Sequence, residues 1–516
     1  MSQAELYTGA DALMHTLEAA GVEMCFANPG TSEMQLVTAL DRTPGVRPVL
    51  ALFEGVVTGA ADGYGRMAGK PAATLLHLGP GVGNGMANLH NARRARSPIV
   101  NLVGDHATDH LKLDAPLTSD IAALAGTVSG WVRTAQTADQ AVTLAAEAVA
   151  AAHQGQSATL ILPADTMWAD SPGVGQPVAT PQPKPVASAT IEAVAKAIKG
   201  AKAPMILLNG HSTQDDGLAA AARLNAVGVR VMCDGFVGRL SRGAGRFAPD
   251  RMKYFSEQAV EDLAGTDLLV LCETVPPVSF FAYPGKPSVL TPEGAEVMTL
   301  ADVGAGGPQA LADLAEALGA PKSVDIPRQD LSGPGPKWNA ATVGQVLAQH
   351  LPEGAVISDD AVTAGMPCYM TTQHAAPHEW LMLTGGAIGQ GLPVALGAAL
   401  ACPDRKVVAL TGDGAGMYMP QTLWSMAREQ ADVLTIVFAN HAYRILNIEL
   451  GRTGAGEPGP AAEALLQIDN PRMDWLKIAE GFGLEASRAH DAASLDAHIQ
   501  SAMAQKGPRL IEVALE

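Results

Sequence analysis

Charged and aromatic residues are scarce in this chain of 516 residues. Charged residues make up 17% of it, against roughly 25% in an average soluble protein, and aromatic residues only 4%. Hydrophobic residues reach 47%, so the interior must be built mainly from small and aliphatic side chains. Basic residues are also few, 34 against 52 acidic ones, which gives a formal net charge of -18. Such a chain repels phosphate backbones, and we expect no nucleic acid partner.

Cysteine is rare, and long apolar runs are missing. The cysteines lack CxxC spacing and are odd in number, a pattern that excludes a disulfide framework and argues against a zinc site. The first residues show no basic stretch followed by an apolar run, as a secretory signal would. Apolar segments such as GLPVALGAALAC are too short to span a bilayer. We therefore expect a soluble, cytoplasmic protein without a membrane partner, whose reduced core cysteines are Cys25, Cys233, Cys272, Cys368 and Cys402.

The two common phosphate-binding fingerprints are absent as well. In LGPGVGNGMAN, a GxGxxG pattern would need glycine where Asn84 or Met86 stands. The Gly-Lys pairs at 69–70 and 285–286 are followed by proline, whereas a P-loop needs serine or threonine. The sequence therefore lacks the motifs that would best support binding of NAD or ATP.

Two Pro- and Gly-rich stretches, 171–187 and 320–336, divide the chain into segments 1–170, 185–325 and 338–516. A chain of this length has room for about three domains. Each segment alternates short apolar runs with longer helix-like stretches, and continuous apolar runs are typical of buried parallel strands. We predict an α/β protein with three doubly wound parallel-sheet domains.

One glycine-rich turn offers candidate metal ligands. In VVALTGDGAGMY an apolar strand runs into Gly412, Asp413 and Gly414, and Asn440 follows the next strand, VLTIVFAN. The separation of 440 − 413 = 27 residues suits a right-handed βαβ unit, which brings both side chains to one sheet edge. Carboxylate, amide and carbonyl oxygens are ligands for a hard cation such as Mg²⁺. Alternatively, Asp413 only caps the helix that follows.

In combination, these features resemble thiamine diphosphate enzymes of the pyruvate decarboxylase and acetolactate synthase superfamily, whose signature is GDG followed by Asn at about this spacing. The resemblance covers the whole chain, in the order pyrimidine-binding, central and diphosphate-binding domain. It implies that Asp413, Asn440 and the carbonyl of Ala442 hold Mg²⁺, which holds the diphosphate. Many relatives have Ser after GDG, whereas this chain has Ala415, so backbone amides must replace that contact. The implied cofactor-binding residues are Gly386, Ile388, Gly412, Asp413, Gly414, Ala415, Asn440 and Tyr443.

The N-terminal segment resembles the same enzymes. ALFEGVVTGAADGYGRMAG places Glu54 where the family carries its catalytic glutamate, which bonds to the aminopyrimidine and promotes loss of the thiazolium C2 proton. The stretch ANPGTSE offers Thr31, and LLHLGPG offers His77, at positions where benzoylformate decarboxylase-like members have active-site residues. The alternatives are a solvated glutamate at a strand end and a satisfied core histidine.

The segment LTGGAIGQGLPVALGAA is similar to the family's loop under the cofactor. The resemblance implies that the Gly386 carbonyl accepts a hydrogen bond from the 4′-amino group and that Ile388 wedges the cofactor into its V shape. The same residues also read as a helix start with proline near its first turn. Both interpretations can hold together.

Departures from the family concern the substrate pocket. VPPVSFFAYPGKP has Phe281, Ala282 and Tyr283 where the decarboxylase pattern brings a second histidine. VGDHATDHLKLDAP supplies His106 and His110, which either line the pocket or solvate a loop. Leu446 is a further pocket candidate. The central segment is short beside synthases that bind FAD, so FAD is not expected.

The leading hypothesis is a thiamine diphosphate- and Mg²⁺-dependent lyase or transferase that decarboxylates a 2-oxo acid. It then releases an aldehyde or joins the carbanion to a second carbonyl, as acetolactate synthases do. The family implies a homodimer or homotetramer with active sites at the subunit interface, where Glu54 acts across the dimer. Alternatives are a 2-hydroxyacyl-CoA lyase, for which GRTGAGEPGP offers only Arg452, and a catalytically silent regulatory paralogue, against which the intact Glu54, Asp413 and Asn440 argue.

Overall fold

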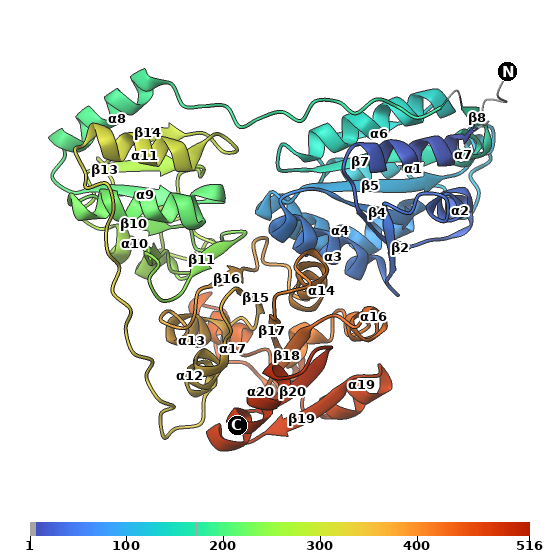
Figure 1. Cartoon of the computed structure of the whole chain (residues 1–516). Helices are drawn as coiled ribbons and strands as arrows, with labels where there is room; N and C mark the ends of the chain where they lie inside the picture. Colours follow the sequence, from blue (N-terminus) through green and yellow to red (C-terminus); the bar gives the residue numbers. More distant parts are fainter. Residues whose placement is uncertain (1–6, 172, 516) are drawn as a thin grey trace.

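The computed structural model describes residues 7–171 and 173–515. Within these ranges, three large sheets of six, five and seven strands follow one another along the chain, each in its own lobe (Figure 1). A small antiparallel pair, β1 (Tyr7–Thr8) with β8 (Asp170–Ser171), closes the N-terminal lobe. The predicted α/β architecture with several parallel sheets is confirmed.

The N-terminal sheet is wholly parallel, in the order β3-β2-β4-β5-β7-β6. Its central strands are buried along their whole length, as expected for a sheet covered on both faces. The strands are β2 (Met24–Asn28), β3 (Arg47–Leu50), β4 (Ala72–His77), β5 (Ile99–Asp105), β6 (Trp131–Thr134) and β7 (Ser157–Pro163). The helices are α1 (Gly9–Ala19), α2 (Met34–Leu40), α3 (Glu54–Ala68), α4 (Leu78–Ala95), α5 (Ile121–Gly126), α6 (Ala138–Ala152) and α7 (Ala164–Trp168), with the short turns η1 (Thr31–Glu33) and η2 (Leu111–Leu113).

The central lobe also has a parallel sheet, in the order β12-β10-β9-β13-β14. Its strands are β9 (Pro204–Leu208), β10 (Arg230–Cys233), β12 (Asp250–Arg251), β13 (Leu268–Cys272) and β14 (Glu296–Ala301). Its helices are α8 (Ser188–Gly200), α9 (Asp215–Ala226), α10 (Ser256–Leu263) and α11 (Gly307–Ala317), with η3 (Gly210–Thr213).

The C-terminal sheet has the order β11-β16-β15-β17-β18-β20-β19. Its strands are β11 (Leu240–Arg242), β15 (Ala355–Asp360), β16 (His378–Leu381), β17 (Val407–Gly412), β18 (Val433–Ala439), β19 (Glu485–Ala489) and β20 (Arg509–Ala514). Its helices are α12 (Ala340–His350), α13 (Gly365–Thr371), α14 (Gly391–Ala401), α15 (Asp413–Gly416), α16 (Thr422–Glu429), α17 (Arg444–Arg452), α18 (Pro460–Leu466), α19 (Trp475–Gly481) and α20 (Ala492–Met503).

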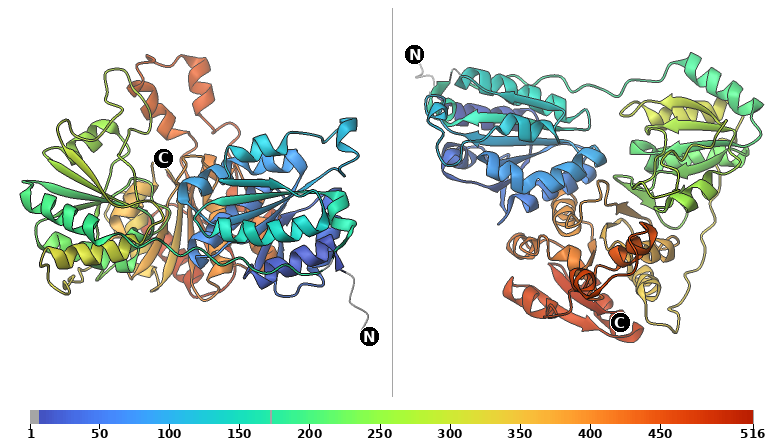
Figure 2. Two further views of the ribbon diagram at one scale, coloured as in Figure 1. Left: turned by 90° about the horizontal axis from the view of Figure 1, so that it is seen from above. Right: turned by 180° about the vertical axis from the view of Figure 1, so that it is seen from behind.

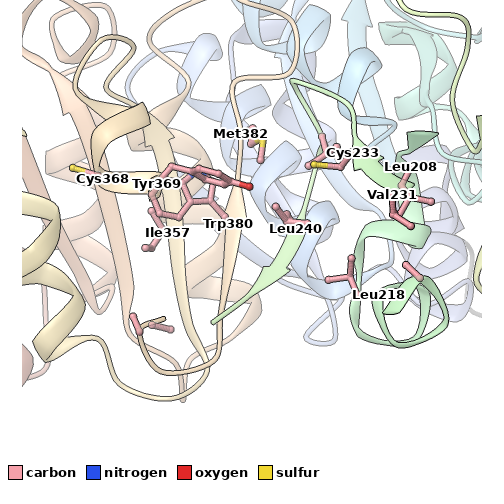
Figure 3. Close-up of a cluster of buried hydrophobic side chains, with 14 of the residues drawn as sticks. Leu208, Leu218, Val231, Cys233, Leu240, Ile357, Cys368, Tyr369, Trp380 and Met382 are labelled. Carbon is pink, nitrogen blue, oxygen red and sulfur yellow. The ribbon is translucent and has the colours of Figure 1, made fainter. Parts of the chain in front are cut away.

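The position of strand β11 was not predicted from the sequence. It belongs to the central segment in chain order, yet it pairs antiparallel with β16 at the edge of the C-terminal sheet. One buried hydrophobic cluster therefore runs from the central sheet through β11 into the C-terminal sheet. Figure 3 shows Cys233 and Leu240 on the central side and Tyr369 and Trp380 on the other. The two lobes are thus joined by a continuous core.

The N-terminal and C-terminal lobes meet through α3 and α14 (Figure 1). Gly63 faces the backbone of Val394, and Gly397 faces the backbone of Ala60, at separations that leave no room for a Cβ atom. Small residues at the crossing let the helix backbones approach closely. Residues 173–187 and 321–335, which lack helix and strand, run along the outside of the lobes (Figure 2). No helix in the described part of the chain combines the length and apolarity needed to cross a membrane.

Candidate active site

Asp413 lies where β17 ends and α15 begins, at the carboxyl edge of the C-terminal sheet. Its side chain is buried, and burial raises the pKa of the carboxyl. Oδ1 accepts a hydrogen bond from the Gly414 N–H at 2.9 Å, and Oδ2 accepts one from the His441 N–H at 2.7 Å. The second bond crosses from β17 to the end of β18. Asp413 is the first residue of α15, and its N-cap is Gly412, so the alternative in which Asp413 only caps this helix does not describe the contacts. Each oxygen keeps a lone pair for a cation.

Asn440 and Ala442 lie beside Asp413 because β17 and β18 are parallel neighbours in register. The Asn440 Oδ1 accepts a hydrogen bond from the Ala442 N–H at 3.1 Å, which closes a tight turn. His441 inside this turn has a φ of 56°, a left-handed conformation. The turn brings an amide oxygen and the following backbone beside the buried carboxylate, a donor set that fits Mg²⁺. No group of three or more His, Cys, Asp or Glu side chains in the described residues, this edge included, could hold a metal, so a cation here would depend on amide and backbone oxygens as well.

Two glycines shape the space beside this edge. A Cβ atom on Gly412 would meet nothing within 4 Å, so the backbone there borders open space. A Cβ atom on Gly414 would lie 2.6 Å from the Tyr443 ring, so Tyr443 packs directly on that turn. The edge therefore leaves open space beside the Gly412 backbone, next to the oxygen donors of Asp413 and Asn440.

The loop that carries Gly386 and Ile388 lies between β16 and α14. Gly386 has a φ of +76°, so a residue with a side chain would be strained there. Asn91 on α4 holds the next residue from both sides, because its amide donates to the Ala387 carbonyl at 2.8 Å and accepts from the Ala387 N–H at 3.2 Å. His90 Nε2 lies 3.1 Å from the Gly385 carbonyl oxygen. The N-terminal lobe thus fixes the loop that the resemblance assigns to the cofactor.

Asp360, at the end of β15, holds the far side of the same loop. Its Oδ2 accepts hydrogen bonds from the Gly389 N–H at 2.7 Å and the Gly391 N–H at 3.1 Å. Oδ1 is buried and has no partner among the described residues. Burial raises the pKa of this carboxyl to about 7. The loop is therefore clamped by a polar group whose charge changes near neutral pH.

Glu54 is the first residue of α3 and is buried. Asn84 on α4 donates a hydrogen bond from its side-chain amide to the Glu54 Oε2 at 3.0 Å. The glutamate is therefore held in place by a neighbouring helix. This placement does not match the alternative of a solvated strand-end glutamate.

Thr31 and His77 lie at the carboxyl ends of strands in the N-terminal sheet. His77, the last residue of β4, has its Nδ1 2.8 Å from the Glu33 Oε2. Glu33 is fully buried and also accepts a hydrogen bond from the Gly30 N–H at 2.7 Å. Thr31 is exposed at the start of η1. A buried carboxylate therefore orients a half-buried imidazole toward the surface of this lobe.

His106 and His110 follow β5 at the same edge. Their ring centroids lie 5.2 Å apart, and the Nε2 of His106 is buried without a hydrogen-bond partner among the described residues. Asp105 accepts a hydrogen bond from the His106 N–H at 2.8 Å, and burial raises the pKa of the Asp105 carboxyl. The pair is thus brought together, near the strand ends that carry His77.

A cavity of about 1140 Å³ opens between the central and C-terminal lobes. Its wall includes Gly386, Ile388, Tyr443 and Leu446, so four predicted residues meet there. The candidates of the N-terminal lobe are not part of that wall; they are Thr31, Glu54, His77, His106 and His110. Asp413, Asn440 and Ala442 are not part of that wall either, so within one chain the cavity brings together only some of the candidates.

Sequence reasoning missed several residues that position these groups. A polar residue inside a helix gives no signal for what it bonds, so the contacts of Asn84 and Asn91 could not be predicted. Asp360 follows an apolar strand run, the one signal that could have marked it. The overlooked residues are Glu33, Asn84, Asn91 and Asp360.

The chain is thus an α/β protein that carries its predicted diphosphate-site residues at the carboxyl ends of parallel strands. Two family models match the chain: the N-terminal TPP binding domain of thiamine pyrophosphate enzymes over residues 7–126 and the C-terminal TPP binding domain over residues 363–513. The chain is 49% identical to a Mycobacterium tuberculosis protein named "Putative acetolactate synthase large subunit IlvX", over 98% of this chain and 99% of that one. It is 26% identical to the benzoylformate decarboxylase of Pseudomonas aeruginosa, over 96% of each chain.

A solved structure agrees with the fold. The Rhodococcus jostii thiamine diphosphate-dependent 4-hydroxybenzoylformate decarboxylase superposes with a TM-score of 0.86 at 23% identity, covering 99% of both chains. The chain belongs to the thiamine pyrophosphate enzyme family, in the group of the decarboxylases and acetolactate synthases. The predicted family membership is confirmed.

Proposed function

We propose that this protein decarboxylates a 2-oxo acid with thiamine diphosphate and Mg²⁺, and releases an aldehyde or transfers the acyl carbanion to a second carbonyl. The observation that carries the proposal is the edge of β17 and β18, where a buried carboxylate, an amide oxygen and open glycine backbone converge. Asp413, Asn440 and the Ala442 carbonyl would hold the cation. The segments 1–170, 185–325 and 338–516 would be the pyrimidine-binding, central and diphosphate-binding domains.

When bound, thiamine diphosphate would supply a nucleophilic carbon and a cationic ring that accepts the electrons of the cleaved C–C bond. The protein's own residues place the reactants and move protons. Glu54, held by Asn84, would hold and move a proton at the aminopyrimidine. The Gly386 carbonyl and the Ile388 side chain would orient the ring system from the clamped loop. His77, oriented by Glu33, would exchange a proton with the substrate.

Glu54 and the other candidates of the N-terminal lobe do not line the cavity that holds Gly386, Ile388 and Tyr443, which supports a site shared by two chains. We propose a homodimer, alone or within a homotetramer, in which the Glu54 group of one subunit faces the Asp413 edge of its partner. Mixing inactive Glu54→Gln and Asp413→Ala subunits should then restore part of the activity, because some interfaces receive both intact groups. Absence of recovery after verified subunit exchange would count against sharing.

The reaction itself is tested with a panel of 2-oxo acids, thiamine diphosphate and Mg²⁺, with CO₂, aldehyde and ligation products all measured. CO₂ release that requires both cofactors supports the proposal, and the ratio of aldehyde to ligation product separates decarboxylase from synthase. Binding of the cofactor without turnover of any acid would indicate a silent paralogue. An acyl-CoA lyase is less well supported, because the side chain of Arg452 is already bonded to both oxygens of Glu257 at 2.5 and 2.7 Å.

A further inference from the structure

Two arginines of the central segment line the cavity without a carboxylate partner. Arg242 and Arg251 both belong to its wall, and the Arg242 side chain is almost fully buried. Nearby arginines are neutralised: Arg230 and Arg239 each pair with a carboxylate. Among the described residues, neither Arg242 nor Arg251 forms such an ion pair. An unpaired charge in a buried apolar setting is costly, so an anion from outside would be favourable here.

The contacts of the two guanidinium groups leave donors unused. Arg242 donates to the Tyr369 carbonyl at 2.7 Å, and its guanidinium carbon lies 3.5 Å from the centre of the Tyr369 ring. Arg251 donates from Nε to the Gly235 carbonyl at 2.8 Å and lies 5.0 Å from the same ring. Within the described chain, the terminal nitrogens of Arg251 donate no hydrogen bond to a protein group. These nitrogens are suited to a bidentate bond with a carboxylate.

The other charged groups of the wall do not neutralise this pair. Lys253 is paired with Asp262 at 2.8 Å, and Asp250 lies 3.5 Å from Arg230. Asp359, Asp360 and Arg444 also belong to the wall, and among the described residues neither carboxyl forms an ion pair with Arg242 or Arg251. Glu449 accepts a hydrogen bond from the Tyr283 hydroxyl at 2.8 Å. Within the described chain, the terminal nitrogens of Arg251 therefore remain without a carboxylate partner.

An apolar path leads from the arginines to the cofactor loop. Arg251 lies 5.8 Å from the centre of the Phe236 ring, and that ring is 5.2 Å from the Phe280 ring. A Cβ atom on Gly386 would lie 2.5 Å from the tip of Phe280, so this ring reaches the loop itself. Two aromatic rings thus separate the proposed reaction centre from the free cation.

We propose that the substrate is a 2-oxo acid whose apolar chain ends in a second anionic group, which Arg251, with Arg242 behind it, binds. This inference rests on the proposed function, since it places the reacting end at Gly386. The distal group takes no part in bond cleavage; it fixes the register of the chain along the rings of Phe236 and Phe280. Substrates with a short neutral side chain, such as pyruvate, leave the cation unpaired.

The test uses two matched series of 2-oxo acids of equal chain length, one ending in carboxylate and one in methyl, with the full-length protein and both cofactors. We expect kcat/KM to favour the carboxylate series by roughly 10- to 100-fold at one chain length, mainly through KM. Arg251→Gln should abolish this preference, and Arg251→Lys should retain part of it. Arg230→Gln, on β10 outside the cavity wall, serves as the matched control and should keep the preference.

Binding of linear dicarboxylates without a keto group, measured by calorimetry on the protein without cofactor, separates the two proposals. Dicarboxylate binding that Arg251→Gln weakens, with no acid turned over, upholds the anion site and overturns the proposed reaction. Turnover of neutral acids with equal or better kcat/KM than their carboxylate partners, in wild type and Arg251→Gln alike, overturns the distal anion. If phosphonate-ended acids surpass the carboxylates, the anion site stands and the carboxylate assignment falls.

Discussion

The two walls of the candidate site are built in different ways. The cofactor edge, Gly412 to Tyr443, uses backbone groups and short side chains fixed by two neighbouring parallel strands. The cavity, which this edge borders only through Tyr443, is lined on its other side by long side chains from the central segment, among them Phe236, Arg251 and Phe280. Because backbone positions follow from the sheet, we expect the cofactor edge to tolerate few substitutions. The long side chains on the central side of the cavity can be replaced one at a time without altering the sheet. We therefore expect these side chains to determine which substrate binds.

The largest effect should come from breaking the cofactor edge. Asp413→Ala removes the carboxylate that faces both Gly414 and His441, and with it the main bridge between an acidic protein and an anionic cofactor. We expect calorimetry in Mg²⁺ to detect no thiamine diphosphate binding. Asp404→Ala, at an exposed turn residue, is the control and should bind normally. Unchanged affinity in Asp413→Ala would remove the metal assignment.

A smaller effect concerns Asp360 and pH. Burial raises the pKa of Asp360 from 3.8 to about 7, so between these values the folded protein keeps a proton that the unfolded chain loses. Stability should therefore fall as pH rises through this window and level off above it, by on the order of a few kcal/mol. Asp360→Asn keeps an oxygen for Gly389 and Gly391 without the charge.

Chemical denaturation of both proteins from pH 4 to 8 measures this difference. The curve of Asp360→Asn should be flatter than that of the wild type, and the gap should widen toward neutral pH. Parallel curves would show that Asp360 does not titrate in this range.

The clamp on the cofactor loop should give the smallest of these effects. Asn91→Ala loses two hydrogen bonds to Ala387, each worth about 1 kcal/mol, so cofactor affinity should fall by up to roughly 30-fold. Calorimetry measures the change, and Asn225→Ala, on an exposed face of the central lobe, is the control. If Asn91→Ala binds the cofactor as the wild type does, the loop is held by other contacts.

The sequence predicted the first wall better than the second. Asp413 and Asn440 could be placed together because strand, turn and return strand follow one another within a short stretch. Glu54 could be named from its motif, but its bond to Asn84 depends on how α3 meets α4. The cavity wall joins β11, α13 and the loop after β13, and no local pattern announces that β11 leaves the central sheet for the C-terminal one. Because this pairing is long-range, the sequence could not predict that Arg242 and Phe280 line the cavity.

The most direct test of the account is hydrogen exchange at C2 of thiamine diphosphate bound to the wild type and to Glu54→Gln. Glutamine keeps the shape and can still bond to Asn84, but it cannot exchange a proton. The account predicts normal cofactor affinity with C2 exchange and turnover slowed by about 10²–10⁴-fold, measured by quenched-flow NMR without knowledge of the substrate. Equal exchange rates in the two proteins would contradict it, since Glu54 would then have no part in activating the cofactor.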